Sequence, residues 1–455
     1  MERRSLASIF LAFLVVASDH YAAVSAFPAQ DPWRKNDPWN WHYFPRNTKV
    51  VRVAYWPAYS ADQYPASSID STLFTHLNYA FANLNASDNT VVPDDAARIA
   101  AFSRTVKSRN PSLKTLLSIG GGGADPKPFS AMASKASSRT AFIWSSIALA
   151  RSNAFDGLDL DWEFPQNQTD MDNLGTLFAE WRFAAAAEAG HSGRPRLLLT
   201  AAVYYSGTIR YELTPRGTAR TYPTKSINAN LDWVGLMAFD YHGSWEPTVT
   251  GAHTALYDPK SDVNTAAGVA RWMAAGLRPD KGVLGLAMYG HSWILSDPSA
   301  KAGIGAPAKS PGPGDATPVF AGIVATVSGD DKATVVYDNV TVTAYAQVGS
   351  LWIGFDNEES IRNKVGFLRS KGMRGYFFWT ASFDSGNGTL SRAGLSFSFC
   401  LFLILCSSFA LVFYFSCGSA GTLRSKTKEE ENERDFAHEL VEITIEEDDG
   451  IKYLL

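Results

Sequence analysis

The sequence predicts an α/β fold: a (β/α)8 barrel with a small α+β insertion between its last two strands, followed by a C-terminal transmembrane helix. Three observations predict it. Eight short apolar runs, bounded by turn residues, alternate with stretches of helical periodicity. A Gly/Pro-rich interval separates the last two runs, and one uncharged apolar run lies near the C-terminus.

Eight predicted strands, mostly followed by helices, indicate a parallel sheet, and eight such units close into a barrel. The strands are Val50–Trp56, Thr75–Phe81, Lys114–Ile119, Gly157–Trp162, Leu197–Tyr204, Trp233–Phe239, Gly282–Met288 and Arg374–Trp379. The predicted helices include Asp94–Lys107, Ser138–Ser152, Met171–Ala189, Thr265–Ala275 and Glu358–Lys371. Between the last two barrel strands, the strand-like pieces Thr334–Tyr337 and Leu351–Phe355 follow Gly/Pro-rich loops, so an insertion is expected at about 296–355.

Both ends of the chain carry apolar segments. Arg3 and Arg4 precede the run from Leu6 to Ala17, which predicts a signal peptide. The uncharged run from Leu395 to Cys417 is long enough to cross a bilayer. Basic residues follow it, which predicts a single-pass type I membrane protein with an extracellular-facing barrel. The expected segments are a signal peptide (1–26), an irregular lead-in (27–47), the barrel (48–394), the membrane helix (395–417) and an acidic cytoplasmic tail (418–455).

Composition narrows the function further. A formal net charge of −4 argues against nucleic acid, which requires a basic surface. All three cysteines lie in or beside the predicted membrane helix, so the barrel is expected to hold no disulfide. Four glycosylation triplets, beginning at Asn85, Asn167, Asn339 and Asn387, fit export. The acidic tail is a candidate docking site for a cytoplasmic partner.

The segment from Asp156 to Pro165 carries the clearest chemical signal. Alternate residues of a strand share a face, so Asp159, Asp161 and Glu163 point the same way. Inside a barrel, like charges and desolvation raise the pKa of at least one of them, which suits a general acid. A metal-binding or merely solvated acidic strand is the alternative. Interleaved Gly, Leu and Trp disfavour a solvated face, and no second acidic cluster is evident for a metal.

This segment, Asp-Gly-Leu-Asp-Leu-Asp-Trp-Glu-Phe-Pro, resembles the signature of glycoside hydrolase family 18, the chitinases, and most resembles plant class V members. The resemblance runs from about Val50 to Gly394. Further motifs that resemble the family are Leu117-Ser118-Ile119-Gly120-Gly121, Leu231-Asp232-Trp233-Val234, Met237-Ala238-Phe239-Asp240, Leu284-Gly285-Leu286-Ala287-Met288-Tyr289-Gly290 and Gly375-Tyr376-Phe377-Phe378-Trp379.

The resemblance implies hydrolysis of β-1,4-linked N-acetylglucosamine polymers or oligomers, such as chitin, by a substrate-assisted retaining mechanism. Glu163 would protonate the glycosidic oxygen and later activate water. Asp161 would hydrogen-bond the acetamido N–H, and Asp159 would support Asp161. No metal or organic cofactor is implied.

The resemblance also implies the sugar contacts. Trp379 would form the floor of the cleavage subsite, and Asp240 would contact the sugar. Met237, Phe81, Tyr289, Trp56 and Trp293 lie in the motifs or near strand ends, and sugar rings stack on aromatic faces. For the last four, core packing is an equally good interpretation.

Phe239 departs from the family, which usually has tyrosine there. The missing hydroxyl would donate a hydrogen bond to the acetamido oxygen, a loss on the order of 10²–10³ in rate by analogy with oxyanion holes. Tyr241 and Tyr205 are candidates to replace it. This departure keeps a second hypothesis open: a membrane-anchored chitin-binding receptor or lectin with weakened catalysis. A third keeps the hydrolase and takes the chitobiose core of N-glycans as substrate.

Overall fold

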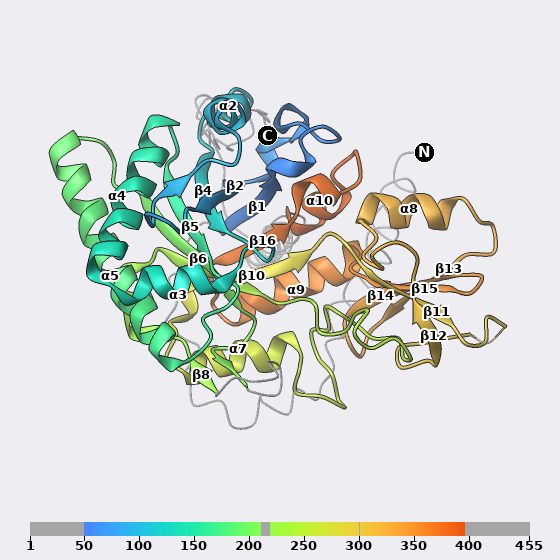
Figure 1. Cartoon of the computed structure of the whole chain (residues 1–455). Helices are drawn as coiled ribbons and strands as arrows, with labels where there is room; N and C mark the ends of the chain where they lie inside the picture. Colours follow the sequence, from blue (N-terminus) through green and yellow to red (C-terminus); the bar gives the residue numbers. More distant parts are fainter. Residues whose placement is uncertain (1–49, 211–218, 300, 396–455) are drawn as a thin grey trace, which may run out of the picture. The chain divides into compact units, whose positions relative to one another are not determined.

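Eight parallel strands close into a barrel (Figure 1) in the computed structural model, which describes residues 50–210, 219–299 and 301–395. The first strand, β1, pairs with both β2 and the last strand, β16, and this pairing closes the barrel. Around the barrel the strands are β1 (Val51–Pro57), β2 (His76–Leu84), β4 (Lys114–Gly120), β5 (Gly157–Asp161), β6 (Leu198–Tyr204), β9 (Trp233–Met237), β10 (Gly282–Ala287) and β16 (Gly375–Trp379).

Helices surround these strands (Figure 1). They are α2 (Ala96–Lys107), α3 (Pro126–Ser134), α4 (Ala136–Ser152), α5 (Gln168–Ser192), α6 (Thr224–Asn230), α7 (Thr265–Ala274), α9 (Glu358–Ser370) and α10 (Thr389–Leu395). Asp and Asn side chains accept hydrogen bonds from free backbone N–H groups at the first turns of several helices; examples are Asp95, Asn167, Asn264 and Asn357.

Short elements complete the barrel. They are the strands β3 (Val91–Val92), β7 (Thr208–Ile209) and β8 (Arg220–Thr221), and the 3₁₀ turns η1 (Ala58–Ser60), η2 (Ala66–Ser68), η3 (Ser71–Leu73), η5 (Pro279–Lys281) and η6 (Ala381–Phe383). Strand β3 pairs antiparallel with β2, and β7 pairs with β8.

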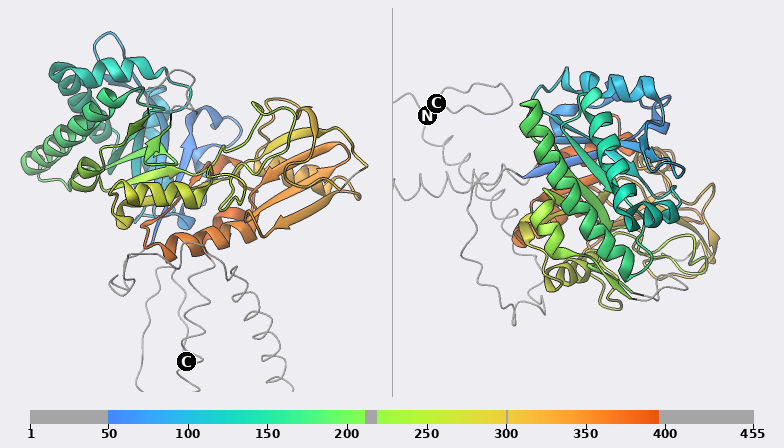
Figure 2. Two further views of the ribbon diagram at one scale, coloured as in Figure 1. Left: turned by 90° about the horizontal axis from the view of Figure 1, so that it is seen from below. Right: turned by 60° about the vertical axis from the view of Figure 1, so that its left-hand side comes forward.

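The insertion lies between β10 and β16, as the sequence predicts, and forms an antiparallel sheet beside the barrel (Figure 2). Its elements are β11 (His291–Leu295), β12 (Ala308–Pro311), α8 (Phe320–Ser328), β13 (Thr334–Asp338), β14 (Thr343–Val348) and β15 (Leu351–Phe355). The sheet order is β12-β11-β15-β14-β13. The insertion begins at β11, a few residues before the predicted position, because β11 follows β10 after a short turn and pairs with β15.

Alternation along the strands divides the apolar residues into two layers. Trp56 and Tyr79 point outward and pack against Phe102 of α2. Tyr55 and Phe377 point inward, with their ring centroids 5.5 Å apart. The outer layer forms the barrel–helix core, and the inner layer forms the floor beneath the site.

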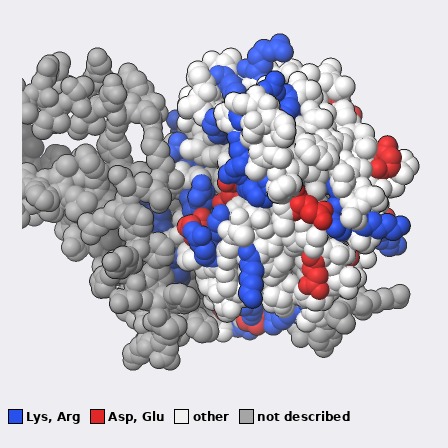
Figure 3. Space-filling model, turned by 90° about the vertical axis from the view of Figure 1, so that its left-hand side faces the viewer, with Lys and Arg blue, Asp and Glu red and all other residues white. Residues whose placement is uncertain are grey.

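Two ion pairs connect the neighbouring helices α4 and α5. Arg139 donates to both carboxylate oxygens of Glu180 at 2.8 Å, and Arg151 binds Glu188 in a similar way. Such forked pairs add directional stabilisation. On the face drawn in Figure 3, acidic side chains lie among the basic ones.

All eight predicted barrel strands are present, with ends that differ by three residues or fewer. Helices α3, α6, α8 and α10 were not predicted, because each spans nine residues or fewer, too short for a pattern to stand out from the sequence. The predicted segments 1–26, 27–47 and 418–455 lie outside the described residues, as does 395–417 apart from Leu395.

The prediction of a C-terminal transmembrane helix, and with it a single-pass type I membrane protein, is wrong by this structure. Within residues 50–210, 219–299 and 301–395, no helix is both long enough and apolar enough to cross a bilayer. Helix α5 has 25 residues, but charged side chains such as Asp172, Arg182 and Glu188 interrupt it. Helix α10 has seven residues.

Candidate active site

The three predicted carboxylates lie in one row at the carboxyl end of β5. Asp159 and Asp161 are on the strand, with 1% and 4% of their surface exposed, and Glu163 follows two residues beyond its end. The intervening Trp162 points outward and stacks on Phe129 of α3. The alternation expected from the sequence therefore holds along the whole row.

Three hydroxyl groups surround Asp159, the deepest carboxylate. Tyr55 and Ser118 donate to its Oδ2 at 2.8 and 2.7 Å, and Thr200 donates to Oδ1 at 2.5 Å. These donors come from β1, β4 and β6. Burial raises the pKa of Asp159, while the three hydrogen bonds lower it.

Asp161 and Glu163 form a coupled acid pair. Burial raises the pKa of Asp161 well above its ordinary value, and the charges of Glu163 and Asp159 raise it further. Burial and the charge of Asp240 raise the pKa of Glu163 to about 7, while a hydrogen bond with Asp161 opposes the rise. The pair therefore shares a proton near neutrality, and its titration belongs to both groups.

The row opens into a cavity of about 700 Å³ at the mouth of the barrel. Asp161, Glu163, Phe81, Trp379 and Tyr55 are among its lining residues. Phe81 and Trp379 lie almost parallel, with ring centroids 5.8 Å apart and an interplanar angle of 22°. They form a flat apolar wall of the kind on which sugar rings stack.

A glycine allows the loop after β4 to approach the acid. A Cβ on Gly122 would lie 3.2 Å from Oε1 of Glu163, a contact tighter than side chains ordinarily make. Gly122 and its neighbour Gly123 are exposed at the cavity. A larger residue at position 122 would narrow the space beside Glu163.

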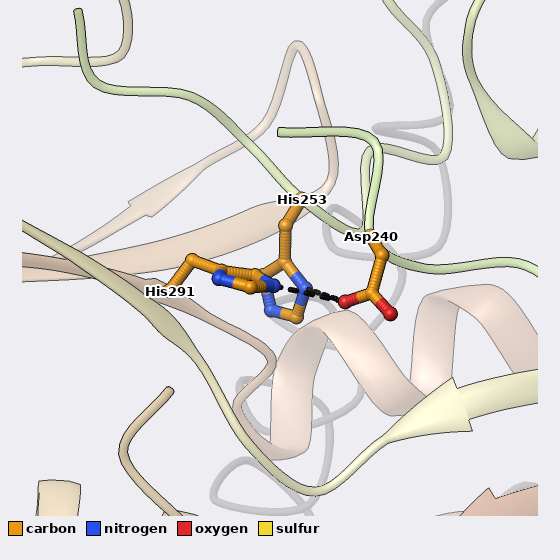
Figure 4. Close-up of side chains that lie close together, drawn as sticks. All are labelled: Asp240, His253 and His291. Atoms are coloured by element: carbon orange, nitrogen blue, oxygen red, sulfur yellow. Dashed lines mark hydrogen bonds and ion pairs between the residues drawn. The ribbon is translucent and has the colours of Figure 1, made fainter. Parts of the chain in front are cut away.

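Asp240 forms the polar wall of the cavity together with Tyr289. The Tyr289 hydroxyl donates to Asp240 Oδ1 at 2.6 Å, and His291 Nε2 lies 2.9 Å from the same oxygen. Figure 4 shows the carboxylate turned toward His291 and His253. Burial opposes ionisation of Asp240, although 46% exposure of the side chain moderates this, and the hydrogen bond with His291 lowers its pKa. Asp240 is therefore ionised.

Two further predicted contact residues line this cavity, in addition to Phe81, Asp240, Tyr289 and Trp379, and two aromatic candidates do not. Met237 and Phe239 line the cavity, and the Phe239 ring lies 6.1 Å from those of Tyr289 and Phe377. Trp56 is 2% exposed in the outer core and donates to the carbonyl of Tyr64. Trp293 is fully buried in the insertion, against Trp352.

Neither tyrosine proposed to replace the missing hydroxyl at position 239 reaches the cavity. The Tyr241 hydroxyl lies 3.0 Å from that of Thr265, and its ring packs against Tyr205 in a separate buried cluster. Both side chains are nearly buried, and neither lines the cavity.

Sequence reasoning did not assign Tyr55, Thr200, His253 or His291 to the site. Strand alternation could have found Tyr55, because it is Trp56's neighbour and faces the opposite side. It could also have found Thr200, which lies on a barrel strand. The two histidines come from a long loop and from β11, and no local pattern brings them together.

Residues 51–384 match Glycosyl hydrolases family 18. The chain belongs to this family. A class V chitinase CHIT5a from Medicago truncatula is 44% identical over 336 residues, which cover 73% of this chain and 86% of that protein. A class V chitinase from Arabidopsis thaliana is 43% identical over 347 residues, covering 76% and 88%.

A crystal structure of a family 18 chitinase mutant from Cycas revoluta, in complex with (GlcNAc)4, superposes with a TM-score of 0.72. It is 42% identical and covers 76% of this chain and 98% of that one. Together with the family match, these relatives identify the chain as a chitinase-like glycoside hydrolase.

Replacing Tyr55 by Phe is expected to lower the free energy of unfolding by about 1–3 kcal/mol, because the buried Asp159 loses one of its three hydroxyl donors. The phenylalanine ring keeps the packing against Trp379 and Phe377. Urea denaturation at pH 7 measures the change.

Tyr376→Phe is the matched control. The Tyr376 hydroxyl is also buried and has no hydrogen-bond partner within the described residues, so its removal should cost little. Equal losses in the two variants would show that the Tyr55–Asp159 hydrogen bond does not stabilise the fold.

Proposed function

We propose that this chain hydrolyses β-1,4-linked N-acetylglucosamine oligomers by a substrate-assisted retaining mechanism, with Glu163 as the acid. The observation that carries the proposal is the coupled pair at the mouth of β5. Glu163 lies on a cavity wall, its pKa is about 7, and Asp161 lies beside it. The related chitinase from Cycas revoluta was crystallised with (GlcNAc)4, which supports the substrate class.

The three carboxyl groups take different roles in this mechanism. Glu163, in its protonated form, gives its proton to the glycosidic oxygen and later removes one from the attacking water. Asp161 accepts a hydrogen bond from the acetamido N–H and aligns the acetamido oxygen with the anomeric carbon. Asp159, held by its three hydroxyl donors, supports the position and charge state of Asp161 from below.

The cavity walls suit the two kinds of surface of an N-acetylated sugar. The C–H face of the ring stacks on the wall of Trp379 and Phe81. Asp240 and Tyr289 present polar groups to the hydroxyls and the acetamide from the opposite side. Met237 and Phe239 complete the wall between them. Trp56 has no part in this arrangement, because it lies in the outer core.

A sugar-binding protein with weakened catalysis is the second candidate, and Phe239 is the observation that favours it. Phe239 lines the cavity without a hydroxyl, and Tyr241 and Tyr205 do not replace it there. Hydrolysis of the chitobiose core of N-glycans would use the same carboxylate row, so substrate comparison is needed to separate it from chitin cleavage.

We also propose that residues 1–26 are a signal peptide and that Asn339 accepts an N-glycan. Asn339 is exposed in the turn between β13 and β14. By contrast, the side chain of Asn167 caps α5, and that of Asn387 accepts hydrogen bonds from Ser385 and Thr389. Those two acceptors have structural contacts to lose.

Glu163→Gln is expected to abolish cleavage of the chitin hexamer while leaving its binding intact, because the amide fills the same space and has no proton to give. Product masses after incubation measure cleavage, and calorimetry measures binding. Saturable binding without cleavage by the unchanged protein would favour the sugar-binding candidate. Cleavage by the variant would remove Glu163 from the mechanism.

Hydrolysis is expected to fall on the alkaline side with an apparent pKa of about 7, where the Asp161–Glu163 pair loses its shared proton. The sign follows from the chemistry: the raised pKa keeps the acid protonated below this value, and the proton is lost above it. The pH dependence of kcat/KM for the hexamer measures it. Activity that stays constant to pH 9 would assign the proton donor to another group.

Phe239→Tyr is expected to raise kcat by on the order of 10²-fold, because the new hydroxyl can donate to the acetamido oxygen as it becomes the nucleophile. KM should change much less. Phe377→Tyr, which alters another cavity aromatic, is the control and should give no such gain. An unchanged kcat in Phe239→Tyr would mean that this hydroxyl is not needed here.

A further inference from the structure

Asp240, His253 and His291 bring three metal-ligating side chains together at the polar wall of the cavity. Asp240 and His253 both come from the long loop between β9 and α7, and His291 comes from strand β11. One ligand atom from each residue lies within 4.8 Å of the others. Figure 4 shows both imidazoles turned toward the Asp240 carboxylate.

The separations are close to those of a metal site. His291 Nε2 lies 2.9 Å and His253 Nδ1 lies 3.8 Å from Asp240 Oδ1. Ligands at about 2.0–2.2 Å around a tetrahedral zinc ion are roughly 3.2–3.6 Å apart. Shifts of a few tenths of an ångström would therefore bring these two contacts to the required distance. The two imidazole nitrogens lie within 4.8 Å of one another and would close in around the ion.

Hydrogen bonding leaves the ligand atom of His253 free. Its Nε2 lies 3.1 Å from the carbonyl oxygen of Tyr289, which can only accept, so Nε2 carries the proton. In the neutral ring, Nδ1 then holds a lone pair. This nitrogen is buried, has no hydrogen-bond partner in the part of the chain that the structure describes, and faces the Asp240 oxygen.

A buried lone pair facing a carboxylate oxygen is unfavourable unless a cation lies between them. A bond from the other imidazole N–H to a backbone carbonyl is also the arrangement that orients histidine ligands in metal sites. Two imidazoles and one carboxylate suit zinc and similar transition metals better than Mg²⁺.

His291 can act as a metal ligand only by losing a hydrogen bond. To present a lone pair on Nε2, it must carry its proton on Nδ1 and give up its hydrogen bond to Asp240. Its Nδ1 is buried without a hydrogen-bond partner among the described residues. We therefore expect weaker binding than at a four-ligand structural site. The exposed side of Asp240 leaves a fourth position open to the cavity.

We propose that Asp240, His253 and His291 bind a divalent transition-metal ion such as Zn²⁺, and that the bound ion inhibits hydrolysis. The inhibition rests on the proposed function, because the ion would bind the carboxylate proposed to contact the sugar and would place positive charge in the cavity that Glu163 also lines. The binding itself does not depend on that function.

Metal binding is tested by calorimetry with Zn²⁺ on the chain produced without a polyhistidine tag and treated with a chelator. One ion per chain is expected, with no binding of Mg²⁺. With Co²⁺, a visible absorption band should report nitrogen and oxygen ligands. His291→Gln and His253→Gln should each weaken Zn²⁺ binding at least tenfold.

His242→Gln is the matched control, because His242 pairs with Glu246 outside the cluster and should keep the affinity unchanged. Circular dichroism checks that the variants fold. If His253→Gln does not fold, Asp240→Asn takes its place, because the Asp240 side chain is about half exposed. Absence of Zn²⁺ binding, or binding that His291→Gln leaves intact, would overturn the site.

Inhibition is measured separately as hexamer cleavage at rising Zn²⁺ concentration. Cleavage should fall with the same midpoint as calorimetric binding and recover on addition of chelator. Binding without inhibition would overturn the regulatory part alone. If the chain cleaves no chitin at all, the proposed function fails, while the calorimetric result still decides the site.

Discussion

The two-residue spacing of Asp159, Asp161 and Glu163 is the constraint on which the rest of the site depends. Alternation turns all three to the inner face of the barrel, where Asp159 and Asp161 are buried away from water and Glu163 is partly exposed on the cavity wall. Each must be stabilised by hydrogen-bond donors or neutralised by a proton. Asp159 accepts hydrogen bonds from hydroxyls on three other strands, two of them adjacent to β5, and Asp161 and Glu163 share a proton. The chemistry of one strand is thus set by the residues that its neighbours point inward.

The cavity above the row divides into an apolar and a polar wall, and this division matches the two-sided character of a pyranose ring. The parallel rings of Phe81 and Trp379 form the first wall. Asp240 and Tyr289 form the second, and their hydrogen bond joins the loop after β9 to the end of β10. Phe239 lies between the walls, where a hydroxyl would serve the reaction and a phenyl ring serves only packing.

The barrel and its carboxylate row could be predicted because each depends on local periodicity: apolar runs for the strands and a spacing of two for Asp159 to Glu163. Tyr55 was missed in favour of Trp56, a one-residue error that exchanges the two faces of a strand. The contacts of the two histidines with Asp240 depend on how a long loop packs against β11, and no periodicity in the sequence predicts this packing. The predicted membrane helix rested on the length of one uncharged apolar run and on the basic residues after it, and none of the described helices has that character.

The pairing of β1 with β16 has a consequence for how the protein is made. These are the first and last strands of the barrel, and they supply Tyr55 and Trp379, whose rings lie 5.6 Å apart. During synthesis, β1 can pair early with β2, but almost the whole domain must follow before its second partner, β16, emerges. Such distant pairing slows folding and leaves one edge of β1 exposed meanwhile. A nascent chain that has reached Phe355 already holds all three carboxylates, yet it has no closed barrel in which to bury them.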